Sequence, residues 1–247
     1  MIISPETLIK KSNYRIIRQI GSGLFGQCFL VEDQKNKKMV FKAIKPEAAI
    51  QTIGKEHYEE VFLSSISHPY IPKYFGTIYL FGSKFLAMEF IEGFTLEYCL
   101  FSKKKAYSLE NIRRIGLQLL SIIAYLTNRN IVHRDISISN ILDNGNNIFL
   151  IDFGLARCVR YDKMGMQSDF HCFGEIILFL LYSRWNPTDK KHRTMAWYDE
   201  LTLNDFQKLY IARLLKLEKP YLTVSDVKEN FITFIDSLKY SSFFQRL

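Results

Sequence analysis

The first ninety residues consist mainly of short segments with the composition and spacing of β-strands. These segments are YRIIRQI (14–20), QCFLVED (27–33), MVFKAI (39–44) and KFLAMEF (84–90). A glycine-rich turn, GSGLFG, separates the first two, and QKNKK separates the second from the third. We therefore expect extended strands joined by turns. One helix is expected over 52–66, and His68-Pro69 ends it.

Beyond Gly93 the hydrophobic residues recur with the period of a helix. Ser108 is a favourable N-cap for a long helix, and the expected apolar face of that helix contains Ile112, Ile115, Leu119, Ile122 and Leu126. Further helices are predicted over 169–182, 203–217 and 224–238, with short strands over 140–143 and 148–154. A strand-rich part is thus joined to a helical part through 89–93. This is an α+β arrangement, and a cleft between two such parts is a natural ligand site.

Composition and charge narrow the class of protein. The chain has 247 residues, of which 48% are hydrophobic and 23% charged, and this is ordinary for a folded globular protein. Its formal net charge of +8 would suit a polyanion such as ATP, nucleic acid or an acidic partner. The lysine runs at 103–105 and 190–191 lack the interleaved aromatic residues and glycines of nucleic-acid modules. We expect these runs to be solvated, and we expect no nucleic-acid partner.

Cysteine usage and hydropathy give the expected location. The four cysteines are scattered, without a C-x-x-C pair, so neither a zinc site nor a disulfide framework is expected. They are Cys28, Cys99, Cys158 and Cys172. The N-terminus lacks a signal pattern, and the longest apolar run, 176–182, is far too short to span a membrane. We therefore expect a cytoplasmic protein with no membrane partner.

Two features of the strand-rich part suit a phosphate ligand. Gly21, Gly23 and Gly26 form G-x-G-x-x-G between two strands, and glycines let backbone N–H groups approach a polyphosphate. The dinucleotide-binding alternative needs a strand followed by a helix, which this context disfavours. Lys42 lies mid-strand among apolar residues, so it is expected to point into a cleft and to need an anion. Glu59 on the 52–66 helix can supply that anion, with Glu56 and Glu60 as competitors.

A second group of polar residues follows the long helix. His133-Arg134-Asp135 precedes Asn140 by five residues, and Asp152-Phe153-Gly154 begins seventeen residues after Asp135. Any one piece could be structural, and His133 in its apolar context is expected to be a packed core histidine. The ordered combination is far less probable by chance than any one piece.

The ordered set GSGLFG, VFKAI, MEFIEG, HRDISISN and IDFG resembles the signature set of protein kinases. The resemblance runs from about Tyr14 to Phe231, and it is greatest to short, stand-alone Hanks-type serine/threonine kinases of bacteria. It implies a bilobal kinase fold with a β-rich N-lobe (12–88), a hinge (89–93) and a helical C-lobe (94–247), all within a single domain (1–247). The implied activity is transfer of the ATP γ-phosphate to a hydroxyl of a protein, which could include the chain itself.

The resemblance also implies residue roles. Lys42, oriented by Glu59, would contact the α- and β-phosphates, and Asp135 would accept or steer the proton of the substrate hydroxyl. Asn140 and Asp152 would hold Mg²⁺. The implied ATP-binding set is Ile20, Gly21, Ser22, Gly23, Leu24, Phe25, Gly26, Cys28, Val40, Lys42, Met88, Glu89, Ile91 and Leu142. Met88 would be the gatekeeper, and backbone groups of Glu89 and Ile91 would meet the adenine edge. Asp169 would begin the buried helix that anchors the catalytic loop, and Leu63, Tyr74, His133 and Phe153 would stack as an internal column.

The sequence also departs from the family pattern. The activation segment is shortened: no Ala-Pro-Glu occurs between Gly154 and Asp169, and the Arg that normally pairs with its Glu is also missing. Removing both halves of a buried ion pair can be nearly neutral. Ser137 replaces the usual Lys, and we hypothesise that Arg157 or Lys163 supplies the missing charge. Docking of an extended peptide is therefore poorly specified.

Two other functions remain open. A nucleotide-binding pseudokinase or ATPase would signal by shape, although such proteins commonly lose one of Lys42, Glu59, Asp135, Asn140 and Asp152. A small-molecule kinase would usually lack the Asp-Phe-Gly sequence. ATP is expected in each case, with Mg²⁺ as the metal.

Overall fold

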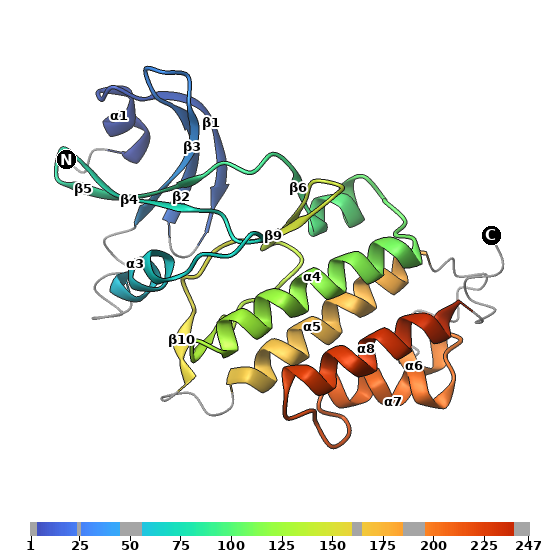
Figure 1. Cartoon of the computed structure of the whole chain (residues 1–247). Coiled ribbons are helices and arrows are strands. Elements are labelled where there is room, and N and C mark those ends of the chain that lie inside the picture. Colours follow the sequence, from blue (N-terminus) through green and yellow to red (C-terminus); the bar gives the residue numbers. More distant parts are fainter. Residues whose placement is uncertain (1–3, 24–25, 45–55, 160–164, 185–195, 240–247) are drawn as a thin grey trace. The chain divides into compact units, whose positions relative to one another are not determined.

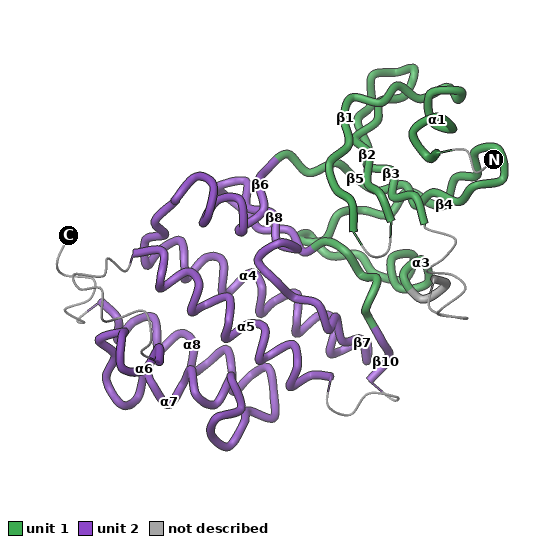
Figure 2. The backbone as a smooth tube through the Cα atoms, turned by 180° about the vertical axis from the view of Figure 1, so that it is seen from behind, with its two compact units in different colours: residues 1–92, 151–156 green, residues 93–150, 157–247 purple. Residues whose placement is uncertain are grey.

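The structure is a computed structural model that describes residues 4–23, 26–44, 56–159, 165–184 and 196–239 (Figure 1). Figure 2 shows that the chain forms two compact units, Met1–Glu92 with Ile151–Ala156 and Gly93–Leu150 with Arg157–Leu247. The Asp-Phe-Gly sequence therefore belongs to the first unit, although the residues on both sides of 151–156 belong to the second. The predicted N-lobe (12–88), hinge (89–93) and C-lobe (94–247) did not assign 151–156 to the first unit, and these bounds stay a prediction.

The first unit is built on one antiparallel sheet of five strands. Its order is β1-β2-β3-β5-β4. The strands are β1 (Arg15–Ser22), β2 (Gly26–Glu32), β3 (Lys38–Ile44), β4 (Tyr74–Leu80) and β5 (Ser83–Glu89). Alternate residues of β2, β3 and β5, such as Phe29, Phe41 and Phe85, form a core with Leu8 and Ile9 of α1 (Pro5–Lys10). Because side chains alternate across a sheet, the residues between them face the opposite side.

The second unit is mainly helical. Its helices are η1 (a π-helix, Tyr98–Ser102), α4 (Leu109–Thr127), α5 (Gly165–Tyr182), α6 (Trp197–Glu200), α7 (Asp205–Leu214) and α8 (Val224–Leu238). α4 packs against both α5 and α8, and these three helices lie side by side in Figure 1. Short strands form two small sheets, β6-β8-β9 and β10-β7. Their bounds are β6 (Phe94–Thr95), β7 (Ile131–Val132), β8 (Ile141–Asp143), β9 (Ile148–Leu150) and β10 (Arg157–Cys158).

Several predicted elements need correction. The helix expected over 52–66 is α3 (Glu56–Ser65), and 52–55 lie outside the described residues. The strand expected over 148–154 ends at Leu150, because Asp152 adopts the left-handed backbone region with φ of 63°. The helix expected over 203–217 is the shorter α7. The helix expected over 169–182 is α5, which begins earlier, at Gly165. Seven elements of the described chain were not predicted: α1, β4, β6, η1, β7, β10 and α6.

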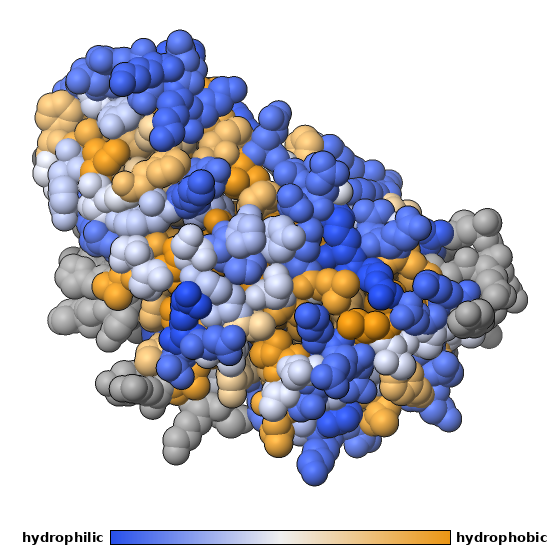
Figure 3. Space-filling view, viewed as in Figure 1, coloured by the Kyte–Doolittle hydropathy of each residue, from blue (hydrophilic) through white to orange (hydrophobic). Residues whose placement is uncertain are grey.

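In the parts of the chain that the structure describes, no helix is both long enough and apolar enough to cross a membrane. The surface seen in Figure 3 is largely hydrophilic, with several hydrophobic areas between the polar ones.

Candidate functional site

Lys42 is the centre of a buried charge cluster in the first unit. It lies on β3 between Phe41 and Ala43, which both face the core, so alternation places Lys42 on the other face of the sheet. Its Nζ donates to both carboxylate oxygens of Glu59 on α3, at 2.7 and 2.9 Å, and to Oδ1 of Asp152 at 2.7 Å. Only 4% of the Lys42 surface is exposed. Of the glutamates considered from the sequence, Glu59 contacts Lys42 and Glu60 contacts Lys84, while the side chain of Glu56 lies outside the described residues.

The protonation states follow from this crowding. Burial by itself would lower the pKa of the Lys42 amine, but attraction to Glu59 and Asp152 outweighs burial and raises that pKa above its usual range. Burial raises the pKa of the Glu59 carboxyl, and Lys42 offsets part of this rise. Lys42 is therefore a fixed cation at neutral pH, suited to hold an anionic group.

Asp152 is held by its own backbone geometry. Its φ of 63° is unusual for a residue other than glycine, and such strain often occurs at functional sites. Oδ1 accepts the amide of Gly154 at 3.1 Å as well as the Lys42 amine. The side chain is one-third exposed, whereas the following Phe153 is buried. Oδ1 is thus held by two donors, and the side chain lies at a partly exposed position.

Gly23 and Gly26 of the loop differ in the space available for a side chain. A side chain at Gly26 would place its Cβ 2.0 Å from the carbonyl oxygen of Ala43, so glycine is required there by the close approach of β2 and β3. A Cβ at Gly23 would meet nothing within 4 Å. The amide of Gly23 donates to the carbonyl of Gly26 at 2.9 Å, which closes the turn. Leu24 and Phe25, between them, lie outside the described residues.

The predicted purine-binding residues of the first unit share one face of its sheet. Cys28 pairs with Lys42 across β2 and β3, and Val40 pairs with Met88 across β3 and β5. All four alternate with core residues, so they lie on the face opposite α1. Burial raises the pKa of the Cys28 thiol to about 11, so the thiol stays protonated near neutral pH.

The remaining predicted ATP-binding residues are less tightly placed. Ile20 on β1 is exposed, while Ile91 and, in the second unit, Leu142 on β8 are half-buried. The amide of Glu89 donates to the carbonyl of Lys73 at 2.8 Å, so one of its two backbone groups is already engaged. Gly21 and Ser22 pair with Cys28 and Gln27, respectively.

In the second unit, Asp135 and Asn140 form the two ends of a short hydrogen-bonded loop. The Asn140 amide group donates to the Asp135 carboxylate at 2.9 Å and to its backbone carbonyl at 3.0 Å. The backbone N–H of Asn140 donates to the carbonyl of Ser137 at 3.0 Å. Asp135 is half-buried. One carboxylate oxygen is therefore held by Asn140, and the residue as a whole is only partly buried.

Asp169 fixes the residues just before that loop. Its carboxylate accepts the amides of His133 at 2.9 Å and Arg134 at 2.8 Å, and only 2% of its surface is exposed. These bonds hold Arg134 in the left-handed region, with φ of 67°. His133 is fully buried, and its Nδ1 accepts the amide of Asp135 at 3.3 Å. This agrees with the core role expected for His133.

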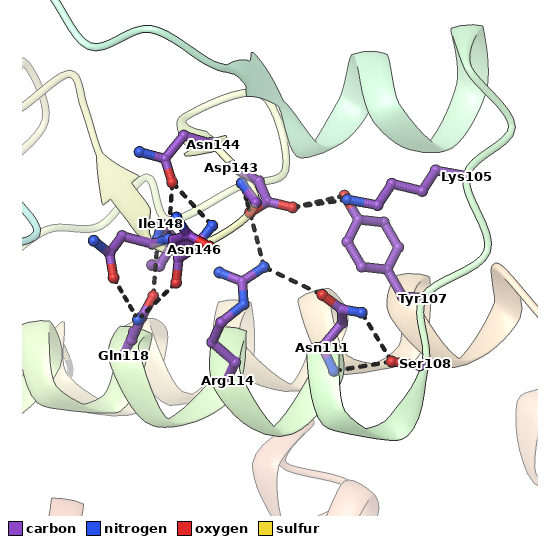
Figure 4. A network of polar contacts seen from close by, with 12 residues as sticks. Lys105, Tyr107, Ser108, Asn111, Arg114, Gln118, Asp143, Asn144, Asn146 and Ile148 are labelled. Carbon is purple, nitrogen blue, oxygen red and sulfur yellow. Dashed lines mark hydrogen bonds and ion pairs between the residues drawn. The ribbon is translucent and has the colours of Figure 1, made fainter.

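Two ion-pair networks beside the site were not predicted. Asp143 of β8 accepts Arg114 of α4 at 2.8 Å and Lys105 at 3.1 Å, as Figure 4 shows. In the first unit, Glu60 of α3 accepts Lys84 of β5 at 2.6 Å and Thr77 of β4. The partners lie 17 to 38 residues apart in the sequence, so no short pattern announces them.

Ser137 stands where related kinases have a lysine, and the replacement of its charge by Arg157 or Lys163 stays a prediction. The Ser137 hydroxyl lies 2.9 Å from the Ser139 hydroxyl, which is a contact within the same loop. Arg157 is half-buried on β10, where its backbone pairs with Val132 of β7. Lys163 lies outside the described residues.

The oxygen-bearing side chains of Asn140 and Asp152 suit a hard cation. Mg²⁺ takes one or two protein carboxylates and keeps several waters, so it does not need a large protein cage. Across the described ranges no cluster of three or more His, Cys, Asp or Glu could hold a metal. Asp152 Oδ1 is engaged by Lys42 and Gly154, and the Asn140 amide nitrogen is engaged by Asp135. Each of the two side chains thus carries an oxygen of the kind that a hard cation accepts, Asn140 in the second unit and Asp152 in the first.

Comparison with known proteins agrees with these features. The family model described as "Protein kinase domain" matches residues 14–172. The chain is 34% identical to the probable serine/threonine-protein kinase YbdM of Bacillus subtilis, over 94% of this chain and 93% of that protein. It is 29% identical to the probable serine/threonine-protein kinase mkcF of Dictyostelium discoideum, over 87% of this chain but only 34% of that protein. It is also 30% identical to cAMP-dependent protein kinase type 3 of Saccharomyces cerevisiae, over 60% of this chain and 38% of that protein.

Proposed function

The chain belongs to the protein kinase family, and from this premise we propose that it is an active kinase that transfers the γ-phosphate of ATP to serine or threonine side chains of proteins. Its relatives YbdM and mkcF are both named as probable serine/threonine-protein kinases, which supports serine and threonine as acceptors. We also propose the roles of the individual residues and Mg²⁺ as the metal.

The observation that carries the proposal is the contact of Lys42 with Glu59 and Asp152. A lysine buried to 4% exposure between two carboxylates is a costly arrangement unless it serves a charged ligand. In protein kinases the strand lysine must be paired with a glutamate of the following helix, and the Asp of Asp-Phe-Gly must be in place, for activity. A binding-only protein does not need all three groups.

Each unit would contribute its own part to catalysis. In the first unit, Lys42 would neutralise phosphate oxygens and the loop closed by Gly23 and Gly26 would approach the phosphates with backbone N–H groups. In the second unit, Asn140 orients Asp135, which would accept or steer the proton of the acceptor hydroxyl. Asn140 and Asp152 would hold Mg²⁺, which when bound neutralises charge on the phosphate oxygens. The protein's work is mostly positioning and charge stabilisation.

The test is phosphate transfer by purified protein with labelled ATP and Mg²⁺, offered both a serine/threonine peptide library and a mixture of small alcohols. Wild-type protein should label peptides or itself. Asp135→Asn should lose about 10²- to 10⁴-fold of this activity, because it removes the proton acceptor while it keeps the size of the side chain. ATP binding, followed by a thermal shift, should persist in this variant. Equal labelling by Asp135→Asn and wild type would contradict the proposal, and labelled alcohols without labelled peptide would favour a small-molecule kinase.

A further inference from the structure

A group of exposed aromatic residues lies on the second unit beside a lysine-rich segment. Phe94, Tyr98, Phe101 and Phe179 are between 42% and 61% exposed. Phe94 stacks on Tyr98 with ring centroids 5.2 Å apart, and Phe101 meets Phe179 of α5 edge-to-face at 6.2 Å. With Lys103 and Lys104 these residues form what we call the aromatic–lysine patch. Exposed aromatic side chains gathered in this way are typical of the central part of a protein-binding surface, and charged side chains are typical of its rim.

The patch is connected directly to the catalytic loop within the same unit. Phe94 and Thr95 of β6 pair with Asp143 and Leu142 of β8, the strand that follows Asn140. At the start of η1, the amide of Glu97 donates to the carbonyl of Ile138 at 2.9 Å. Ile138 lies between Asp135 and Asn140 in the sequence. A segment bound at the patch would therefore lie close to the residues proposed to receive the acceptor hydroxyl.

The charges of the patch specify the kind of partner. Lys105 is tied to Asp143 at 3.1 Å, as Figure 4 shows, so it anchors the lysine run to β8. Lys103 lies over the Phe94 ring, 3.3 Å from its centroid, and both Lys103 and Lys104 are exposed. Lys104 makes no ion pair with any residue in the described ranges. The residues of the patch include two exposed lysines and no acidic residue, while Glu92, Glu97 and Glu110 flank it in the sequence. The patch is thus positively charged and apolar together.

The catalytic segment itself offers little to hold a substrate. No Ala-Pro-Glu sequence occurs between Gly154 and Asp169, so the ledge that usually receives a peptide is missing from the sequence. Asp135 is the only acidic residue of the loop 135–140, so this loop gives no reason to prefer a basic substrate. A second surface near the loop would then contribute to substrate recognition.

We propose that the aromatic–lysine patch docks the protein substrate, through an acidic segment that carries an aromatic or aliphatic side chain and lies near the serine or threonine to be phosphorylated. This inference rests on the proposed kinase function. The substrate's carboxylates would face Lys103 and Lys104, and its apolar side chain would cover Phe101 and Phe179. Charges at such a rim favour the partner mainly through encounter and specificity.

The first test measures binding without turnover. The probe is a fluorescent peptide with one serine flanked by glutamates and two phenylalanines, titrated onto Asp135→Asn protein and followed by anisotropy. The double variant Phe101→Ser, Lys104→Glu should bind it about tenfold more weakly, and its binding should lose part of its salt dependence. The matched control, Phe206→Ser with Lys228→Glu, makes the same chemical changes at exposed positions of the same unit. Equal effects of the two double variants would overturn the proposal.

The second test measures turnover of the same peptide by otherwise wild-type protein. The patch variant should raise the KM for the acidic peptide about tenfold, with kcat and the KM for ATP unchanged, and a matched peptide with lysines for glutamates should be a poor substrate for both. If peptide binds at the patch but nothing is phosphorylated, the kinase proposal fails and docking stands. If peptide is phosphorylated with the same KM by both proteins, docking fails alone. A dimer that the patch variant converts to a monomer would also overturn docking, since the patch would then join two copies.

Discussion

At the scale of single residues, Lys42 holds the most informative position, because two carboxylates share one ammonium group. The amine contacts Glu59 and Asp152 at nearly equal distances, from 2.7 to 2.9 Å. With either carboxylate removed, the lysine would be drawn to the other. Glu59 thus sets where the ammonium group points, rather than whether it is charged.

Glu59→Gln tests that role. Glutamine keeps the size of the side chain but removes the charge, so Lys42 should turn toward Asp152 and lose its orientation for phosphate. We expect kcat/KM for ATP to fall by about 10², which is typical for the loss of one aligned electrostatic group. Steady-state kinetics with varied ATP gives the value. Glu218→Gln, an exposed change on the second unit, is the control. Wild-type kinetics in Glu59→Gln would show that Asp152 alone can orient Lys42.

At the scale of elements, α4 holds the second unit together through a glycine. A Cβ on Gly116 would lie 2.1 Å from the ring of Phe231 on α8, and both residues are fully buried. In an isolated helix, Gly→Ala is favourable by about 1 kcal/mol. Here the ring leaves no room for the added methyl group, so packing opposes helix propensity.

We therefore expect Gly116→Ala to destabilise the protein by about 1–3 kcal/mol, because the core must shift to admit the methyl group. Urea unfolding at neutral pH measures this change. In a Phe231→Leu background, Gly116→Ala should reduce the free energy of unfolding much less than it does in the wild type, because the smaller side chain removes the clash. A gain in stability for the single variant would mean that α4 and α8 are less closely packed than described.

The Asp143 network connects β8 to α4 and should make stability depend on acid pH. Burial by itself would raise the pKa of Asp143, but hydrogen bonds and attraction from Arg114, with Gly145 and Lys105, outweigh it and lower that pKa. The folded pKa thus lies below the unfolded one. The stabilisation is complete above the unfolded pKa, about 3.9, and is lost as pH falls through the folded pKa.

Asp143→Asn should reduce the free energy of unfolding by about 2 kcal/mol at pH 7, since it leaves Arg114 without its buried partner. The difference from wild type should shrink as the pH falls below 4, where the wild-type carboxylate also loses its charge. Urea titrations at several pH values test both statements, with the exposed Asp199→Asn as control. A difference that does not change with pH would mean that the charge of Asp143 is unimportant.

Elements with one buried face could be predicted from sequence. The helix after Ser108 was expected with its cap, and the Ser108 hydroxyl does accept the amide of Asn111. β4 was missed because its residues are all partly or well exposed and Gly76 interrupts them, so neither face is marked by buried residues. α1 has only six residues, too few to show a helical period. β9 appeared too long because apolar residues continue past the point where the backbone turns.

The candidate site was predictable where its residues lie in short motifs. The motifs singled out Asp135, Asn140 and Asp152, and the resemblance to protein kinases gave them roles, which stay a prediction. Glu59 was expected against Lys42 from its place on the following helix, with Glu56 and Glu60 as competitors. The partners of Asp143 and Glu60 could not, since ion pairs between distant elements leave no local pattern. The lysine run at 103–105 was expected to be merely solvated. In the structure its three members differ, because Lys105 binds Asp143, Lys103 covers Phe94 and Lys104 is exposed.

At the scale of the whole molecule, the course of the chain links its two compact units. The backbone passes from the first unit to the second after Glu92, returns for Ile151–Ala156, and leaves again. Asp152 lies in this returning segment, with the residues of the second unit on both sides in sequence. A ligand that binds both Lys42 and Asp152 should therefore stabilise the contact between β3 and the segment 151–156 within the first unit.

Nucleotide binding should accordingly raise the stability of the whole chain. A ligand at one hundred times its dissociation constant adds about 2.7 kcal/mol to the free energy of unfolding. For a protein of this size, such a gain raises the melting temperature by about 5–10 °C. ATP with Mg²⁺ should give this shift in the wild type. Asp152→Asn should reduce the shift with Mg²⁺ present and make it insensitive to the metal, because it removes a charged oxygen ligand. Asp199→Asn should behave as wild type. A wild-type shift that is the same with and without Mg²⁺ would remove the metal from the proposal, and no shift with any nucleotide would remove ATP binding itself.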